Sequence, residues 1–318
     1  MTRVLVTGAA GFIGSHLAEA CLTRGFEVVA VDSLTPYYSP EIKRRNAAVF
    51  AVHPNCLYIE QDLLQLDLSS LLRSTDIVFH LAAQPGVRAS WGRDFDVYTQ
   101  LNITAVQMLL EAAKTARLSK LVFASSSSVY GDAESLPTQE DTVLRPVSPY
   151  GATKALGEHL VYLYWKSYGV PAVTLRYFTV YGPRQRPDMA FNRAIAAGLT
   201  GREFTLFGDG HQTRDFTYVA EAVEGTIAAG LDGTPGRVYN LGGGSCISMN
   251  EVLKIIGSLT GSLRICRLER QRGDAQDTAA DIARAREDLD FGPSWSLPGG
   301  LAEQVTWQRS LVELPAGL

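Results

Sequence analysis

Short apolar runs alternate with longer stretches of helical periodicity through the first half of the chain. The runs predict strands at Val4–Val6, Glu27–Val31, Leu57–Glu60, Ile77–Phe79, Leu121–Ala124 and Val173–Leu175. The longer stretches predict helices at Phe12–Arg24, Val97–Ala116 and Tyr150–Tyr168, and Gly25 suits the C-cap of the first. Such alternation is typical of βαβ units and predicts an α/β fold with a parallel sheet and right-handed crossovers.

The alternation breaks after Arg176, where the pattern turns to loops and shorter elements. We predict a loop over 182–187, a turn at 208–210, a helix at Phe191–Leu199 and strands at Phe204–Phe207 and Val238–Leu241. A further helix starts near Ser248, which has capping-box spacing with Glu251. The change predicts two domains, residues 1–178 and 179–318, with the chain returning to the first around 214–243.

Charge and cysteine usage exclude several classes of partner. A net charge of −4 gives no broad basic face, so neither nucleic acid nor an anionic membrane is an expected partner. The chain enters a predicted strand at once, leaving no room for a signal peptide, and no apolar stretch has membrane-spanning length. Four separated cysteines lack metal spacing and suit a reducing compartment, so we expect a cytoplasmic protein without a metal site: Cys21, Cys56, Cys246 and Cys266.

A glycine-rich turn, Gly8-Ala9-Ala10-Gly11-Phe12-Ile13-Gly14, joins the first predicted strand to the first helix. Its three glycines let the backbone approach a pyrophosphate, and the helix N-terminus offers free N–H groups and a positive dipole end. Asp32 ends the second strand 18 residues beyond Gly14, where a carboxylate can bind the adenosine ribose hydroxyls. An acid there would repel the 2′-phosphate of NADP, so the sequence predicts an NAD site.

Tyr150 and Lys154 lie four residues apart on a predicted helix and therefore share a face. A free tyrosine, with a pKa of about 10, is a poor base. A nearby ammonium and the positive nicotinamide ring would favour the phenolate. Tyr150 would then take a proton from a sugar hydroxyl as hydride leaves the same carbon for NAD, and Lys154 would also hold the nicotinamide ribose. An ordinary exposed helix face is the alternative interpretation of this pair.

The G-x-x-G-x-x-G spacing resembles the extended short-chain dehydrogenase/reductase family over nearly the whole chain. That resemblance implies a Rossmann-type doubly wound parallel sheet with a smaller C-terminal mixed α/β domain that binds a nucleotide sugar. It further implies that Asp62-Leu63 contacts the adenine, that Leu81-Ala82-Ala83 lines the cofactor cleft and that Tyr177 is among the cofactor-binding residues. Asn102 matches a family asparagine near the cofactor, with a purely structural role as the alternative.

The serine run Ser125-Ser126-Ser127-Ser128 follows a predicted strand and precedes Val129-Tyr130-Gly131. The resemblance implies that the Ser126 hydroxyl bonds the reacting oxygen. Nucleotide-sugar 4,6-dehydratases carry Asp and Glu at the next two positions, and UDP-glucuronate decarboxylases carry Glu at the second. Ser127 and Ser128 cannot titrate usefully near neutrality. Dehydration therefore lacks its acid–base pair, and decarboxylation lacks its usual acid.

The sharpest resemblance covers Tyr177–Met189, where the string Y-F-T-V-Y-G-P-x-x-R-P-D-M is similar to UDP-glucuronate 4-epimerases. The segments 32–38 and 84–88 resemble the same family. UDP-galactose 4-epimerases usually have Asn where this chain has Thr179. A sugar carboxylate needs hydrogen-bond donors, each worth about 1.5–3 kcal/mol. Ser127, Ser128 and Thr179 offer hydroxyls, Arg186 is the charged candidate, and Arg184 is expected to be a solvated loop residue.

At the nucleotide end, the resemblance implies that Arg214 binds the diphosphate with help from Arg88. It further implies that Met189, Phe191 and Phe207 wall the uracil and that Asp274 binds the uridine ribose. Core packing is the alternative for the two phenylalanines.

These features together predict NAD-dependent 4-epimerisation of UDP-glucuronate to UDP-galacturonate through a 4-keto sugar, with tightly bound NAD regenerated in each cycle. UDP-glucose 4-epimerase and UDP-glucuronate decarboxylase remain as alternatives. A non-catalytic protein that binds NAD or nucleotide sugars is a third, and the intact set of Ser126, Tyr150 and Lys154 argues against it. A homodimer is implied by the resemblance alone.

Overall fold

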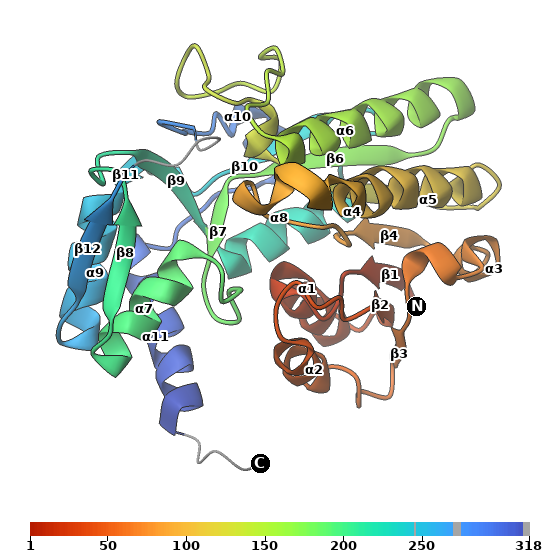
Figure 1. Cartoon of the computed structure of the whole chain (residues 1–318). Coiled ribbons are helices and arrows are strands. Elements are labelled where there is room, and N and C mark those ends of the chain that lie inside the picture. The colour runs from red at the N-terminus through yellow and green to blue at the C-terminus, as the bar shows by residue number, and fades with distance from the viewer. Residues whose placement is uncertain (245, 270–274, 314–318) are drawn as a thin grey trace.

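The computed structural model describes residues 1–244, 246–269 and 275–313. Within these ranges a seven-stranded sheet has the order β10-β6-β5-β4-β1-β2-β3 (Figure 1). Every neighbouring pair is parallel, which confirms the predicted α/β fold. The strands are β1 (Arg3–Thr7), β2 (Glu27–Asp32), β3 (Cys56–Glu60), β4 (Ile77–His80), β5 (Lys120–Ser126), β6 (Ala172–Tyr177) and β10 (Val238–Leu241).

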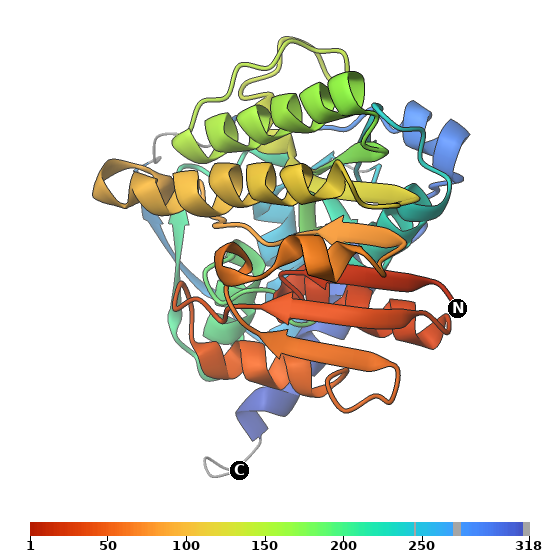
Figure 2. The same cartoon turned by 90° about the vertical axis from the view of Figure 1, so that its right-hand side faces the viewer.

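Side chains of the central strands alternate between two cores, as the pleat of a strand requires. Val4 and Val6 join the core under α1 (Phe12–Thr23) and α8 (Val219–Leu231). Leu5 points the other way, into the core under α5 (Ala105–Ala113) and α6 (Pro149–Tyr168). Figure 2 shows α5 in yellow and α6 in lime green running side by side along that second face. The sheet is therefore doubly wound.

The order of the central strands reverses between β1 and β4. The chain runs outward from β1 to β2 and β3, and then returns to place β4 on the other side of β1. Helices leave two neighbouring strands in opposite directions at such a point, which opens a crevice at their carboxyl ends. In this chain the crevice lies beyond the paired residues Thr7 and His80.

The predicted helix at Val97–Ala116 has three parts in the structure. These are α4 (Phe95–Thr99), a π-helical turn (Gln100–Thr104) and α5, which ends at Ala113. The π-turn buries Asn102, whose side chain bonds the backbone N–H and C=O of Gln84 at 2.7 and 3.0 Å and the Thr153 hydroxyl at 3.0 Å. The side chain thus fastens the loop after β4 to α6, which agrees with a structural role.

The second half builds two smaller sheets in the described part of the chain. One has the order β11-β9-β7, with strands β7 (Thr179–Tyr181), β9 (Thr213–Tyr218) and β11 (Cys246–Ser248). The other pairs β8 (Glu203–Phe207) with β12 (Arg264–Leu268) in parallel. Helices α7 (Ala190–Thr200), α9 (Met249–Thr260), α10 (Ala283–Leu289) and α11 (Leu297–Glu313) belong to the same half. The Ser248–Glu251 capping box is present at the start of α9.

Several elements were not expected from the sequence pattern: α2 (Pro40–Ala48), α3 (Leu68–Leu72), α8, α10, α11 and strands β7, β9, β11 and β12. Short 3₁₀ turns occur at Leu63–Gln65, Arg88–Ser90, Gly92–Asp94 and Ser127–Val129. β10 extends the main sheet beside β6, far along the chain from the other six strands. The domain boundary at residue 178 stays a prediction. No helix in the described ranges is long and apolar enough to cross a membrane.

Candidate active site

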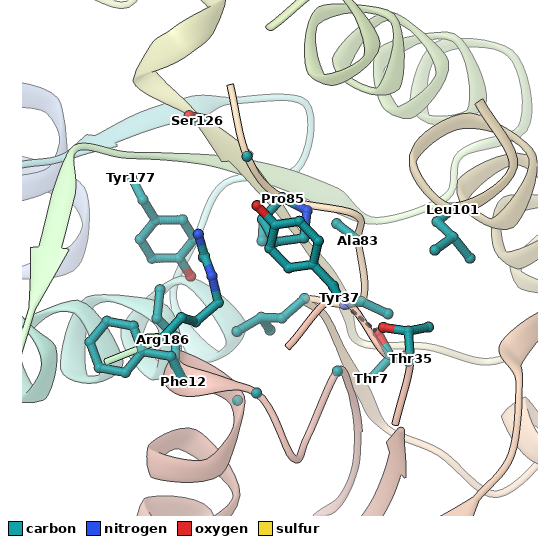
Figure 3. A pocket seen from close by; sticks show the side chains of 18 of the residues that line it. Thr7, Phe12, Thr35, Tyr37, Ala83, Pro85, Leu101, Ser126, Tyr177 and Arg186 are labelled. Carbon is teal, nitrogen blue, oxygen red and sulfur yellow. Dashed lines mark hydrogen bonds between the residues drawn. The ribbon is translucent and has the colours of Figure 1, made fainter. Parts of the chain in front are cut away.

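A cavity of about 420 Å³ opens at the carboxyl edge of the central sheet. Figure 3 shows residues from several of its walls, with Arg186 extending into the space between Tyr177 and Tyr37. All predicted cofactor-binding residues line this cavity: Gly8, Gly11, Phe12, Ile13, Gly14, Asp32, Asp62, Leu63, Leu81, Ala82, Ala83, Tyr150, Lys154 and Tyr177. The structure thus brings them together, and their contacts with a cofactor stay a prediction.

The glycine turn has no room for a side chain at Gly8 or Gly14. A Cβ on Gly14 would lie 2.1 Å from the Gly8 carbonyl oxygen, and one on Gly8 would lie 2.8 Å from the Ala82 nitrogen. Gly8 also has φ +71°, a conformation that favours glycine. Gly11 is the N-cap of α1 and supplies no side-chain cap, so the helix begins with its N–H groups at the cavity. This backbone cradle fits a pyrophosphate.

Asp32 is held rigidly at the wall of the cavity. Its carboxylate accepts hydrogen bonds from the backbone N–H groups of Ala10 at 3.0 Å and Leu34 at 2.8 Å. Burial raises the pKa of Asp32, and the Lys43 ammonium, 4.0 Å from the carboxylate, opposes that rise. Lys43 is itself buried and donates to the Thr35 hydroxyl at 3.0 Å. Sequence reasoning missed Lys43, because it lies on α2, which the pattern did not predict.

The N-terminus of α6 brings Tyr150 close to the serine run. Ser148 caps the helix by accepting the Gly151 N–H at 3.1 Å, so Tyr150 sits in the first turn. A Cβ on Gly151 would lie 2.5 Å from the Ser128 carbonyl oxygen, so glycine permits this close approach. The Ser126 hydroxyl accepts the Ser128 N–H at 3.1 Å and lies 3.1 Å from the Ser128 hydroxyl.

Burial dominates the titration of both predicted catalytic side chains. It raises the pKa of Tyr150, while a hydrogen bond with Ser126 and the charge of Arg186 lower it. Burial lowers the pKa of Lys154 to about 8, and the Glu158 carboxylate opposes that change. The Lys154 ammonium donates to the Ala124 carbonyl oxygen at 2.8 Å. The charge of Arg186 thus favours the Tyr150 phenolate in this structure, and the same role for Lys154 stays a prediction.

The predicted carboxylate-binding residues Ser127, Ser128, Thr179 and Arg186 line the same cavity. Arg186 is already paired, since its Nε and Nη2 donate to the two carboxylate oxygens of Asp188 at 2.9 and 3.0 Å. The Tyr37 hydroxyl reaches Asp188 from the opposite loop at 3.4 Å. Sequence reasoning did not identify this bidentate pair, although the i, i+2 spacing of Arg and Asp in one loop was visible.

The expectation that Arg184 is a solvated loop residue is wrong. Its side chain is only 15% exposed and forms an ion pair with Glu19 of α1 at 2.7 Å. His16 of the same helix donates to the Pro183 carbonyl oxygen at 2.9 Å. These contacts anchor the loop that carries Arg186 to the helix that follows the glycine turn.

A second cavity of about 210 Å³ adjoins the first, and Thr179 and Met189 line both. Its walls include the predicted nucleotide-end residues Arg88, Phe191, Phe207 and Arg214. The Arg88 guanidinium lies 4.6 Å from the centre of the Phe207 ring. Phe191 is 2% exposed and packs against Phe216, so it belongs to the core as well as to the cavity wall. Asp274 lies outside the described residues.

Residues 4–242 match the NAD dependent epimerase/dehydratase family. The chain belongs to this family. An uncharacterized UDP-glucose epimerase of Bacillus subtilis is 43% identical over 98% of this chain and 99% of its own length. A UDP-glucuronate 4-epimerase of Thermodesulfobacterium geofontis is 39% identical over 99% of this chain and 98% of its own.

A solved structure closely matches this epimerase/dehydratase fold. It is the UDP-glucuronic acid 4-epimerase of Bacillus cereus in complex with UDP-glucuronic acid and NAD. It is 43% identical to this chain with a TM-score of 0.95, and the match covers 98% of this chain and 100% of that one. The Rossmann-type fold and the dependence on NAD are therefore shown, and the glycine cradle and Asp32 of this chain fit that cofactor.

We expect Gly14→Ala to remove most of the NAD that co-purifies with the protein, at least about tenfold, because the methyl group displaces the Gly8 carbonyl. Chromatography of the nucleotide released by denaturation measures this loss. Gly257→Ala on α9 is the matched control, since its Cβ would make ordinary contact with Leu263 at 3.6 Å. If Gly14→Ala co-purified with as much NAD as the wild type, the glycine turn would not be the pyrophosphate-binding cradle.

Proposed function

We propose that the chain is an NAD-dependent UDP-glucuronate 4-epimerase, an isomerase that forms UDP-galacturonate. The supporting observation is that one cavity holds Ser126, Tyr150 and Lys154 together with the donors suited to a sugar carboxylate. Its solved relative from Bacillus cereus contains UDP-glucuronic acid and NAD, which supports the same substrate and cofactor.

Tyr150 removes the proton of the sugar 4-hydroxyl, and Ser126 bonds the reacting oxygen. Bound NAD supplies a reversible acceptor for the hydride of carbon 4. The Arg186 charge lowers the pKa of Tyr150 and so favours the phenolate that this step requires. The second cavity anchors the UDP group through Arg88 and Arg214 while the 4-keto sugar turns over. After the turn, hydride would return from the cofactor to the opposite face of carbon 4, which inverts that carbon, and Tyr150 would give its proton back to the oxygen.

The 4-keto intermediate of this reaction is a β-keto acid and loses carbon dioxide when the breaking bond stands perpendicular to the ketone. The site must therefore hold the carboxylate near the plane of the ketone. Hydroxyl donors at Ser127, Ser128 and Thr179 and the guanidinium of Arg186 provide this restraint.

Two other reactions compete with this proposal. The Bacillus subtilis relative, an uncharacterized UDP-glucose epimerase, supports UDP-glucose 4-epimerisation. That substrate has no carboxylate, so Arg186 would have none to bind. UDP-glucuronate decarboxylation would require an acid where this chain has Ser128. Both use the same Tyr150 chemistry, so the product distinguishes them. A non-catalytic NAD-binding protein would turn over neither sugar.

Incubation of the purified protein with UDP-glucuronate, without added NAD, is expected to yield UDP-galacturonate by proton NMR. Tyr150→Phe should lower kcat by about 10²–10⁴-fold, because the general base is removed. Tyr162→Phe, on an exposed position of the same helix, is the control and should retain activity. Conversion of UDP-glucose alone would favour the neutral epimerase, and a pentose product would favour the decarboxylase.

We expect Thr179→Ala to release some decarboxylated product, because one donor that holds the carboxylate in plane is lost. Its preference for UDP-glucuronate over UDP-glucose should fall about tenfold or more. Thr205→Ala is the control. It removes a comparable hydroxyl in the second cavity, away from the carboxylate, and should release no decarboxylated product. Slower epimerisation of Thr179→Ala without any pentose would refute this role.

A homodimer is part of the proposal, with α4 and α6 at the interface. Phe95 and Val97 of α4 and Leu156 and Leu163 of α6 are exposed apolar side chains, and the two helices contact each other. Water disfavours such a surface, and a second copy would cover it.

Sedimentation should give the wild type about twice the chain mass of 34.5 kDa. Leu163→Glu should shift the protein toward the mass of one chain, whereas Leu231→Glu, equally exposed but on α8, should not. A wild type that sediments as one chain would exclude the dimer.

We also place the protein in the cytoplasm, without nucleic acid or membrane as partners. Its four cysteines are free in the structure, which suits a reducing compartment. The net charge of −4 disfavours binding to polyanions.

A further inference from the structure

A buried ion pair lies directly behind the catalytic residues. Glu158 of α6 accepts hydrogen bonds from Arg176 of β6. Nε donates to Oε1 at 2.9 Å and to Oε2 at 3.2 Å, and Nη2 donates to Oε2 at 2.6 Å. The Ser125 hydroxyl of β5 donates to the same carboxylate at 2.5 Å. Glu158 and Arg176 are 6% and 4% exposed. One carboxylate thus joins a helix to two neighbouring strands.

Each partner of Glu158 is the sequence neighbour of a residue at the cavity. Ser125 and Arg176 are paired across β5 and β6, and the next pair in the register is Ser126 and Tyr177. Lys154 lies one helical turn before Glu158, on the same face of α6. Its ammonium holds the Ala124 carbonyl, one residue before Ser125. Lys154 and Glu158 therefore clamp consecutive residues at the end of the strand that presents Ser126.

The pair is also fixed from behind. Nη1 of Arg176 donates to the Tyr130 hydroxyl and to the Glu140 carbonyl oxygen, both at 2.8 Å. Tyr130 donates in turn to Asn240 of β10 at 2.7 Å. Every connection in this network is a hydrogen bond between buried groups, so a displaced carboxylate would leave several groups unsatisfied.

We infer that Glu158 is a positioning residue for the epimerase, which fixes Ser126 and Lys154 relative to each other through Ser125 and Arg176. The inference rests on the proposed function, because it assigns Glu158 to the reaction of Ser126, Tyr150 and Lys154. Glu158 lies behind these residues and acts through them.

Electrostatics adds a second effect of the same carboxylate. Lys154 is buried, which lowers its pKa, and the negative charge of Glu158 supports the ammonium form. Two other titratable groups lie near Lys154. Tyr150 of α6 lines the same cavity, and His80 on β4 is neutral, because burial and the charge of Lys154 lower its pKa to about 3. Arg176 on β6 faces Glu158 rather than Lys154. Loss of the carboxylate charge should therefore lower the pKa of Lys154.

Three variants separate the effects of charge, reach and packing. Glu158→Gln keeps the shape and removes the charge, and Glu158→Asp keeps the charge and shortens the reach. The double variant Glu158→Leu/Arg176→Met replaces the buried pair by apolar groups, a change that proteins often tolerate. Glu111→Gln is the control, because Glu111 of α5 likewise accepts hydrogen bonds from two side chains, those of Lys114 and Tyr164, but is itself 44% exposed.

Carbon NMR of lysine Cε, with the Lys154 signal assigned by Lys154→Arg, measures the Lys154 pKa without any turnover. We expect Glu158→Gln and the double variant to lower this pKa by about one unit, and Glu158→Asp to leave it near the wild-type value. With UDP-glucuronate, all three should lose about 10- to 100-fold in kcat with little change in KM, because the reacting groups are misplaced. Glu111→Gln should match the wild type in both measurements.

A folded double variant with wild-type kcat and an unchanged Lys154 pKa would overturn the inference. So would a Glu158→Gln variant whose thermal stability alone falls, since that result describes a merely structural ion pair. A wild type that does not turn over UDP-glucuronate would instead defeat the proposed function, and the NMR titration would still decide whether Glu158 acts on Lys154.

Discussion

Parallel pairing of the seven central strands puts all of their carboxyl ends on one edge, and the chemistry of this protein depends on that edge. β1 delivers the glycine turn, β2 delivers Asp32 and β5 delivers Ser126, while β6 delivers Tyr177. None of these residues is near another in sequence. Their approach follows from the sheet register, in which Ser126 pairs with Tyr177 and Thr7 pairs with His80. A slip of one residue in any of these strands would turn its cavity residue into the core.

Around that edge, charged side chains form three ion pairs, two of which are buried. The buried pairs are Asp32 with Lys43 and Glu158 with Arg176, whereas Arg186 and Asp188 are partly exposed. A buried pair seldom adds stability over an apolar replacement, since desolvation consumes most of the attraction. In this protein the buried pairs serve to orient the carboxylates. Asp32 is aimed at the cavity by two backbone N–H groups, and Arg176 holds the Glu158 carboxylate with a bidentate grip that an apolar side chain cannot reproduce.

Most strands of the main sheet could be predicted because they are compact apolar runs buried on both faces. The edge strand β3 is more exposed and was found from its apolar run alone. The missed elements lacked such a signal. α8 is buried on most of its surface, so no polar face marks its period, and α11 opens with Leu-Pro-Gly-Gly, a poor helical sequence. The site residues could be predicted from the sequence because they belong to motifs with fixed spacing. Partners such as Glu19 for Arg184, or Glu158 for Arg176, lie 165 and 18 residues away, and only the tertiary fold reveals them.

The pairing of Arg186 with Asp188 explains how one guanidinium could act both on Tyr150 and on a sugar carboxylate. An unpaired guanidinium inside the cavity would be costly to bury. Asp188 offsets that cost through Nε and Nη2, and Nη1 is the guanidinium nitrogen that this pair does not use. The Tyr37 hydroxyl and the ion pair of Arg184 with Glu19 hold the loop from either side. The Arg186 charge can thus stay close enough to lower the pKa of Tyr150. In the proposed function, the hydroxyls of Ser127, Ser128 and Thr179, which line the same cavity, would share the binding of the acidic sugar. Under that proposal, specificity for a carboxylate would arise from several hydroxyl donors around one fixed cation, and the same donors would restrain the carboxylate of the 4-keto sugar.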